Sequence, residues 1–313
     1  MVASILLFPG QGAQRVGMGR DLADRFPEAR RVFDAVDEAL QTPLSRLMWE
    51  GPEDELTLTH NAQPAIVAHS LAVHAVLRDA LQPAAVLGHS VGEFSAYAAA
   101  GALDLADTVR LVRRRGELMQ EAGTQRAGAM SAIVGMAGEN VERVCRTVGD
   151  ADRVVVAANL NAPEQTVISG DPAAVEEAGA ACREAGARRV LPLKVSGAFH
   201  SPLMEPAVEP FREALAAVRW RDPKVPVVSS ARATVVRTGA EARSILDRQL
   251  VEPVQWVRAV RAAWTLAAGP DTDFLELGPG RVLAGLLKRI VAKARVTSIG
   301  DPAAVESLLE MAS

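Results

Sequence analysis

Cysteine is scarce in this sequence, and long basic tracts are absent. The 313 residues include only Cys145 and Cys182, and neither lies in a Cys-x-x-Cys or histidine-rich pattern. We therefore expect neither a disulfide framework nor a metal site. No basic tract exceeds RRR at residues 113–115, and the formal net charge is −4, which argues against a nucleic-acid partner.

Long apolar runs are also missing. No stretch approaches the length of a membrane span, and the opening MVASILLF lacks the basic region and the cleavage site of a signal peptide. We therefore expect a soluble cytoplasmic protein without a membrane partner. The chain is 49% hydrophobic and 23% charged, so it can bury a large core, and its length fits one large domain that carries an insertion.

Short apolar strands alternate with helical patterns through most of the chain. ILLF and AAVLG predict buried strands, and helical patterns cover about residues 20–40, 62–80 and 105–123. Beyond residue 194 the pattern predicts the strand VPVVSSA, two helices, the strand DFLELG, a helix after GPG and a last strand near RVTSI. This alternation is typical of an α/β protein with a parallel sheet that is covered on both faces.

Residues 127–194 have a different order of elements. AMSAIVGM, RVVVAANL, QTVISG and RRVLPLKV are strand-like, and two helical patterns lie between them in the order βαββαβ. That order is the ferredoxin-like split motif. We therefore expect a small subdomain at 127–194, inserted into a large domain made of 1–126 and 195–313.

Ser90 lies in the motif GHSVG, between an apolar strand and a helical pattern. The motif is typical of a nucleophile elbow, in which Gly88 and Gly92 let the backbone pack closely and project the hydroxyl above the sheet. The helix N-terminus would stabilise negative charge that develops there. An ordinary turn that contains a serine is the alternative, which the strand before it and the helix after it make less favoured.

A serine nucleophile needs a base, and five histidines are candidates. His69 and His74 lie in an apolar helical pattern that indicates packing, and His60 lies in THNAQP, which we expect to be a polar loop. His89 adjoins the serine in sequence, so its side chain is expected to diverge and to serve packing or orientation. His200 is the preferred base, because SGAFHSPLM is expected to be a loop after the last strand of the insert.

Arg115 lies within an apolar stripe of its predicted helix, and it is the clearest indication of the substrate. A guanidinium is rarely buried without a partner, and its fork is suited to a carboxylate. The alternatives are an arginine that extends to the surface or one paired with a protein carboxylate. The stripe consists of Thr108, Leu111, Val112, Arg115, Leu118, Met119 and Ala122.

The glycine-rich stretch PGQGAQRVGMG lacks the spacing of a dinucleotide-binding loop. A loop that donates backbone hydrogen bonds fits better. In sites built on a nucleophile elbow, the oxyanion hole takes one N–H from the residue after the nucleophile, here Val91, and another from an earlier strand-end loop. Gln11 is well placed to supply the second.

FPGQGAQ, GHSVGE, VRLVRRRGELMQ, GAFHSPLM and RQLVEPVQW together resemble the malonyl-CoA:acyl-carrier-protein transacylase family, in the same order and over nearly the whole chain. The resemblance implies an α/β-hydrolase-like core with a ferredoxin-like insert. It also implies a malonyl-CoA:ACP S-malonyltransferase that works by ping-pong acyl transfer, with no bound cofactor. Malonyl-CoA and the phosphopantetheine thiol of acyl carrier protein would be its substrates, in fatty acid or polyketide biosynthesis.

By this resemblance Ser90 is the nucleophile, His200 is the general base and Arg115 binds the malonyl carboxylate. Gln11 and Val91 supply the oxyanion hole.

Three further residues take roles from the same resemblance. The carbonyl of Gln249 orients the histidine, Gln63 lies near the pocket in the stretch NAQPA, and Phe199 disfavours an α-methyl group. The carrier protein is the expected partner and the enzyme is expected to be a monomer. Two alternatives stay open at this point: a serine thioesterase or acyl hydrolase of the same fold, and a non-catalytic protein that docks carrier proteins.

Overall fold

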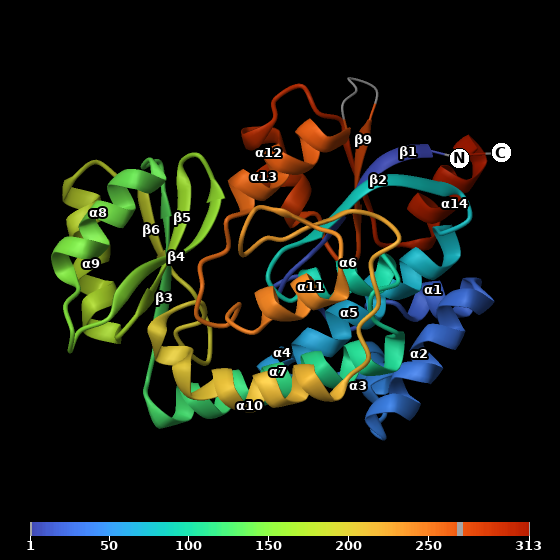
Figure 1. Ribbon diagram of the computed structural model, residues 1–313, viewed down its shortest axis with the longest axis horizontal. Coiled ribbons are helices and arrows are strands. Elements are labelled where there is room, and N and C mark those ends of the chain that lie inside the picture. The colour runs from blue at the N-terminus through green and yellow to red at the C-terminus, as the bar shows by residue number, and fades with distance from the viewer. Residues whose placement is uncertain (1, 268–271, 313) are drawn as a thin grey trace.

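The computed structural model describes residues 2–267 and 272–312. Figure 1 shows two units side by side, a larger one around a six-stranded sheet and a smaller one around a four-stranded sheet. The larger sheet has the order β10-β9-β1-β2-β7-β8, and all neighbours are parallel except β7 and β8. Its strands are β1 (Val2–Phe8), β2 (Leu81–Gly88), β7 (Val227–Val228), β8 (Val235–Val236), β9 (Asp273–Leu277) and β10 (Val296–Ile299).

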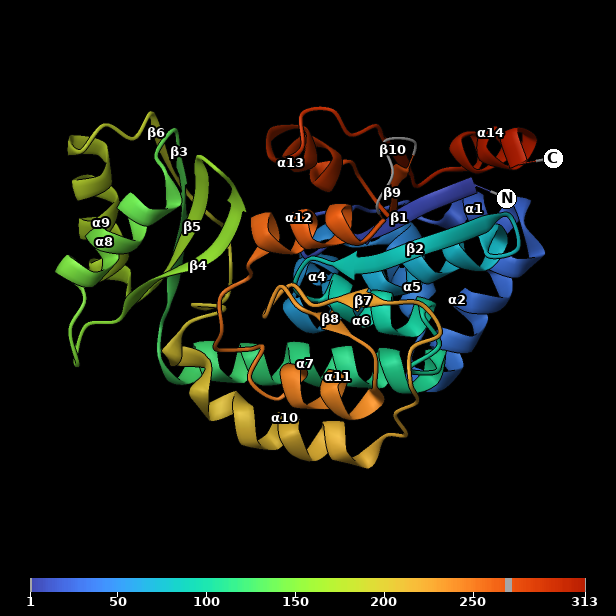
Figure 2. The same cartoon turned by 45° about the horizontal axis from the view of Figure 1, so that its top comes forward.

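Helices cover both faces of this sheet, as the sequence predicts (Figure 2). Along the central strand β1, Leu6 and Phe8 pack into a cluster with α5 and α6, whereas Ile5 and Leu7 pack into a second cluster with α12 and α13. The run ILLF at the end of this strand is thus continuously apolar because it is buried on both sides. The helices of this unit are α1 (Arg20–Arg25), α2 (Pro27–Leu40), α3 (Leu44–Glu50), α4 (Glu53–Thr57), α5 (Thr59–Leu77), α6 (Gly92–Ala99), α7 (Leu105–Gln125), α10 (Glu205–Ala217), α11 (Gly239–Leu246), α12 (Trp256–Ala267), α13 (Val282–Ile290) and α14 (Pro302–Ala312).

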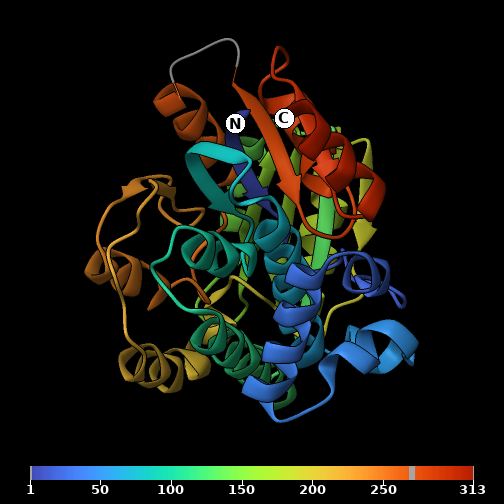
Figure 3. The ribbon, with the colours of Figure 1, turned by 90° about the vertical axis from the view of Figure 1, so that its right-hand side faces the viewer.

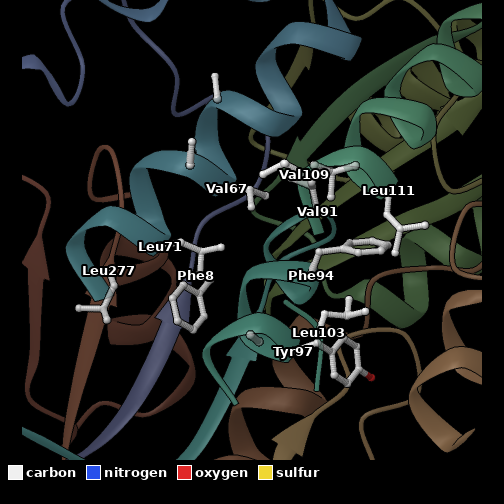
Figure 4. Packing of buried hydrophobic residues seen from close by; sticks show 14 of the residues in the cluster. Phe8, Val67, Leu71, Val91, Phe94, Tyr97, Leu103, Val109, Leu111 and Leu277 are labelled. Atoms are coloured by element: carbon white, nitrogen blue, oxygen red, sulfur yellow. The ribbon is translucent and has the colours of Figure 1, made fainter. Parts of the chain in front are cut away.

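Figure 4 shows the first of these clusters around the start of α6. Phe8 lies near Leu71 of α5, and Phe94 of α6 lies near Leu111 of α7. All four side chains are buried. The packing fixes α6, and with it the turn that carries Ser90, against the central strand.

The smaller unit is an antiparallel sheet with two helices on its outer face (Figure 1). The strand order is β4-β5-β3-β6, which is the ferredoxin-like arrangement expected from the sequence. Met130 and Val167 point from the inner face into the cluster of the larger unit. The elements are β3 (Ala129–Val134), α8 (Gly138–Val148), β4 (Val155–Ala162), β5 (Gln165–Gly170), α9 (Pro172–Glu184) and β6 (Arg189–Pro192).

Several expected elements differ in detail. The single helix expected at 20–40 is two helices, because Phe26 adopts an extended backbone (φ −122°, ψ 117°) before Pro27, the first residue of α2. THNAQP is the first turns of α5 and not a loop, although it contains Pro64. The proline removes the usual helical donor to the carbonyl of His60, which instead accepts a hydrogen bond from Arg113 at 3.2 Å. Helices α3, α4, α10 and α14 were not anticipated.

Both ends of the chain lie on the side of the larger unit that faces away from the smaller one (Figures 1 and 3). Among the described residues, no helix combines the length and the apolar character needed to cross a membrane.

Candidate active site

Ser90 occupies the sharp turn between β2 and α6, with its backbone in the left-handed region at φ 53°. The two flanking glycines are required by close packing. A Cβ atom on Gly88 would lie 1.9 Å from the carbonyl carbon of Gly92, and one on Gly92 would lie 2.2 Å from the carbonyl oxygen of Phe8. The turn therefore presents the serine hydroxyl at the carboxyl end of the central strands.

His200 lies across from Ser90, in the loop between β6 and the short 3₁₀ helix Pro202–Met204. Its Nε2 is 2.7 Å from Ser90 Oγ, and its Nδ1 is 3.0 Å from the carbonyl oxygens of both Gln249 and Glu252. Because carbonyl oxygens only accept hydrogen bonds, Nδ1 carries the ring hydrogen, and Nε2 is left to accept from the serine hydroxyl. The second carbonyl, that of Glu252, was not anticipated from the sequence.

The environment of His200 favours the neutral imidazole. Burial, followed by the nearby charge of Arg115, lowers its pKa from 6.5 to about 3, although the two carbonyls oppose this change. The ring is therefore unprotonated near neutral pH and able to accept a proton.

Arg115 extends from the buried stripe of α7 toward the serine, and its side chain is almost fully buried. Nη1 donates to Gln63 Oε1 at 2.9 Å, and Nη2 donates to Ser90 Oγ and Gln249 Oε1, both at 3.1 Å. Its Nε–H has no acceptor in the part of the chain that the structure describes. Burial lowers the pKa of Arg115 to about 9, so the guanidinium remains positive at pH 7.

Glu93 is a buried carboxylate in this region that the sequence reasoning missed. It lies in the first turn of α6 with no exposed surface, and it accepts hydrogen bonds from the backbone and hydroxyl of Ser230, from Gln249 Nε2 and from the Tyr97 hydroxyl. A signal was present: Glu93 is the one charged residue in the otherwise apolar or small stretch EFSAYAAAG. Such a residue on a short buried helix requires partners.

Ser90, His200 and Arg115 border a cavity of about 300 Å³. Gln11 and Val91 border it, and the backbone N–H of neither has an acceptor among the residues that the structure describes. Phe199 contributes a mostly buried ring, and Met130 and Val167 close the cavity from the smaller unit. No group of three or more His, Cys, Asp or Glu side chains is placed to hold a metal ion within the described ranges.

The two units are connected directly beside the cavity. His89 Nε2 lies 2.7 Å from Asn161 Oδ1 of β4, so the residue before the serine bridges the units. Val254 exchanges backbone hydrogen bonds with β4, donating to Ala158 at 2.8 Å and accepting from Leu160 at 2.9 Å. These contacts hold the inner face of the smaller sheet in place against the cavity.

Comparison with known proteins agrees with this geometry. The profile of the "Acyl transferase domain" family matches residues 5–305. A malonyl CoA-acyl carrier protein transacylase of Bacillus subtilis (strain 168) is 44% identical over 305 residues, which cover 97% of this chain and 95% of that protein. The chain belongs to the malonyl-CoA:acyl-carrier-protein transacylase family. The transacylase of Escherichia coli (strain K12) is 41% identical over 99% of this chain and 100% of that protein.

Solved structures of transacylases share the fold over the whole chain. The acyl carrier protein S-malonyltransferase of Vibrio cholerae is 38% identical, with a TM-score of 0.92 over 97% of this chain and 99% of that one. A malonyl-transacylase in complex with a holo type II polyketide synthase acyl-carrier protein is 39% identical, with a TM-score of 0.94 over 99% of this chain and 100% of that one.

The structure brings together all the transacylase site residues that the sequence predicts. Those that border the cavity are Gln11, Gln63, Ser90, Val91, Arg115, Phe199 and His200. Gln249 lies behind them in contact with Arg115, whereas the side chain of His60 is turned toward Gln120 of α7 at 2.8 Å.

Proposed function

We propose that the protein transfers a malonyl group from malonyl-CoA to the phosphopantetheine thiol of an acyl carrier protein, by way of a malonyl ester on Ser90. The observation that carries this proposal is the buried guanidinium of Arg115, 3.1 Å from the Ser90 hydroxyl. A cation in that position suits an acyl group that ends in a carboxylate, since a charge-assisted hydrogen bond is about twice as strong as a neutral one.

In the first half-reaction, the Ser90 hydroxyl attacks the thioester carbonyl while His200 Nε2 takes its proton. The N–H groups of Val91 and Gln11 stabilise the oxyanion, because both border the cavity without another acceptor among the described residues. The C–S bond then breaks, and the proton on His200 passes to the departing thiolate of CoA. A malonyl ester of Ser90 remains.

The second half-reaction runs the same steps in the opposite direction. His200 takes the proton of the carrier thiol, the thiolate attacks the ester carbonyl, and the C–O bond to Ser90 breaks. The proton returns to the serine oxygen. The carbonyls of Gln249 and Glu252 hold the imidazole in the required tautomer through both steps, in the place of the carboxylate found in other serine enzymes. The chemistry as written requires no bound cofactor.

Gln63 and Phe199 complete the acyl site. Gln63 Oε1 accepts from Nη1 of Arg115 while Ser90 accepts from Nη2, so Gln63 limits the directions in which the guanidinium can turn. The buried ring of Phe199 borders the cavity. We expect it to crowd an α-methyl group on the acyl chain. One methyl group is worth about 1–3 kcal/mol of discrimination.

We further propose that an acyl carrier protein is the partner and that the enzyme acts as a monomer in the cytoplasm. The relatives named as carrier protein transacylases and the solved complex with a holo carrier support the partner. Ser90 of a single chain already contacts both His200 and Arg115, so the reacting groups need no second copy, which supports a monomer. The buried free thiols of Cys145 and Cys182 are suited to a reducing compartment. We also propose that residues 127–194 are an insertion into the domain formed by 1–126 and 195–313.

Labelled malonyl-CoA tests the function directly. Incubation should add one malonyl group to the intact protein, as seen by mass spectrometry, and Ser90→Ala should abolish that adduct. Addition of holo carrier protein should then move the label to the carrier. Rapid release of free malonate, with no label on the carrier, would establish a hydrolase instead. A protein that never acquires the label would be a docking protein.

A further inference from the structure

Arg115 is a buried cation that no carboxylate of the described chain touches. Its three hydrogen bonds go to the neutral oxygens of Gln63, Gln249 and Ser90. A buried charge without a counter-charge is costly, and the nearest opposing charge that acts on Arg115 is that of Glu93. The two charged groups are separated by the side chain of Gln249.

Hydrogen-bond donors surround the carboxyl group of Glu93. Gln249 Nε2 lies at 2.9 Å, the Ser230 hydroxyl at 2.7 Å, the Ser230 backbone N–H at 3.3 Å and the Tyr97 hydroxyl at 3.3 Å. Burial raises the pKa of Glu93, and the Ser230 and Gln249 donors oppose that rise. All four groups donate to the carboxyl oxygens, so the ionised form satisfies every contact.

The side chain of Gln249 fits between the two charges in one orientation only. Its Oε1 accepts from Arg115, while its Nε2 donates to Glu93 and to the backbone oxygen of Ser90 at 3.2 Å. A guanidinium only donates and a carboxylate only accepts, so a flipped amide would break contacts at both ends. Glu93 supplies the charged acceptor for Nε2, and together with the Ser90 carbonyl it fixes which end of the amide faces Arg115.

We propose that Glu93 is a positioning residue that acts through Gln249 to aim the Arg115 guanidinium, and so sets the preference of the site for acyl groups with a carboxylate. This inference rests on the proposed malonyl transfer. Gln249 also provides the backbone carbonyl that holds His200, so one residue links the carboxylate-binding group to the base. Glu93 reaches neither the cavity nor the reacting atoms, and its effect is on selectivity.

The test compares kcat/KM for malonyl and acetyl transfer from the two CoA thioesters. In Glu93→Gln the amide of Gln249 loses its charged acceptor and is held less firmly between Arg115 and the Ser90 carbonyl. The malonyl-to-acetyl ratio should fall by at least ~10-fold, the worth of about one charge-assisted hydrogen bond. Tyr97→Phe is the matched control, since it removes another donor to the same carboxylate and keeps the buried ring. Its ratio should stay within about twofold of the wild type.

A double mutant separates positioning from general damage. If Glu93 acts through Arg115, then Glu93→Gln should leave the ratio unchanged in an Arg115→Ala background. An equal loss of both activities in Glu93→Gln, or a similar fall of the ratio in both backgrounds, would overturn the proposal.

Two further measurements keep the outcome unambiguous. If Glu93→Gln does not fold, as judged by circular dichroism, Gln249→Met breaks the same link and leaves the backbone carbonyl to His200. Its ratio should also fall, and an unchanged ratio would reject the role of Glu93. If the wild-type protein forms no malonyl ester, the proposed function itself is wrong. If the wild type transfers malonyl and the malonyl-to-acetyl ratio of Glu93→Gln equals that of the wild type, only this inference is wrong.

Discussion

The low pKa of His200 predicts acylation that is almost independent of pH in mildly acidic solution. Burial and the charge of Arg115 lower the pKa to about 3, so ~99% of the imidazole is still neutral at pH 5. A histidine with the ordinary pKa of about 6.5 would be only ~3% neutral there and would lose about 25-fold in rate between pH 7 and pH 5. The expected change for this protein is less than about twofold.

The assay is the rate of malonyl-enzyme formation at low malonyl-CoA concentration, followed by quenching and mass spectrometry from pH 5 to 7.5. The malonyl carboxylate stays ionised over this range, and circular dichroism at each pH checks that the protein is folded. A rate of malonyl-enzyme formation that falls about 25-fold between pH 7 and pH 5, with its midpoint near pH 6.5, would refute the reasoning.

The same assay can assign the cause of the shift. Replacing Arg115 by leucine removes the second largest contribution, so the pKa of His200 should rise and the acid limb should move to higher pH. Acetyl-CoA serves as the acyl donor in this comparison. Because burial is the largest contribution, the midpoint should stay below 6.5. An acid limb that does not move in Arg115→Leu would show that the guanidinium has no influence on the base.

Three other changes give further tests. Arg115→Ala should lower kcat/KM for malonyl transfer by roughly 100-fold or more while acetyl transfer is kept or improved, and equal losses would count against a carboxylate site. Gly88→Ala places a Cβ 1.9 Å from backbone and should prevent folding, so an alanine variant with wild-type melting behaviour would contradict the packing of the turn. Phe199→Ala should improve methylmalonyl over malonyl transfer by about 10-fold or more, and an unchanged ratio in a panel of acyl-CoAs would exclude a steric role.

Acid stability offers a fourth test, because burial lowers the pKa of His69 to about 4. The unfolded chain then binds more protons than the folded one below pH 6.5, so this contribution to stability is complete above pH 6.5 and is lost as the pH falls toward 4. Between pH 7 and 4.5 the free energy of unfolding should fall by about 2 kcal/mol less in His69→Gln than in the wild type, as measured by urea unfolding. A variant that loses as much as the wild type would disprove this.

The sequence was sufficient for the features that depend on local pattern. The continuous apolar run of β1 is explained by its burial on both faces, and the apolar stripe of α7 predicts the buried position of Arg115. The turn at Ser90 followed from the strand, the two glycines and the helix. These features depend on periodicity and on close backbone packing, and both are determined by residues that are close in sequence.

Features that depend on distant contacts were not predictable in the same way. The polar stretch THNAQP, with its proline, predicts a loop at the start of α5, yet Arg113 of α7 donates to the carbonyl of His60 that Pro64 leaves without a helical donor. Glu93 was passed over because its partners Ser230 and Gln249 lie more than one hundred residues away in sequence. The second carbonyl on His200 likewise comes from Glu252, in a separate segment.

Ser90 and His200 both adopt left-handed backbone angles, with φ of 53° and 56°, although neither is glycine. Such a conformation costs an ordinary residue of order 1–3 kcal/mol, whereas glycine adopts it freely. The fold therefore gives up backbone stability at the two positions where the hydroxyl and the imidazole must face each other.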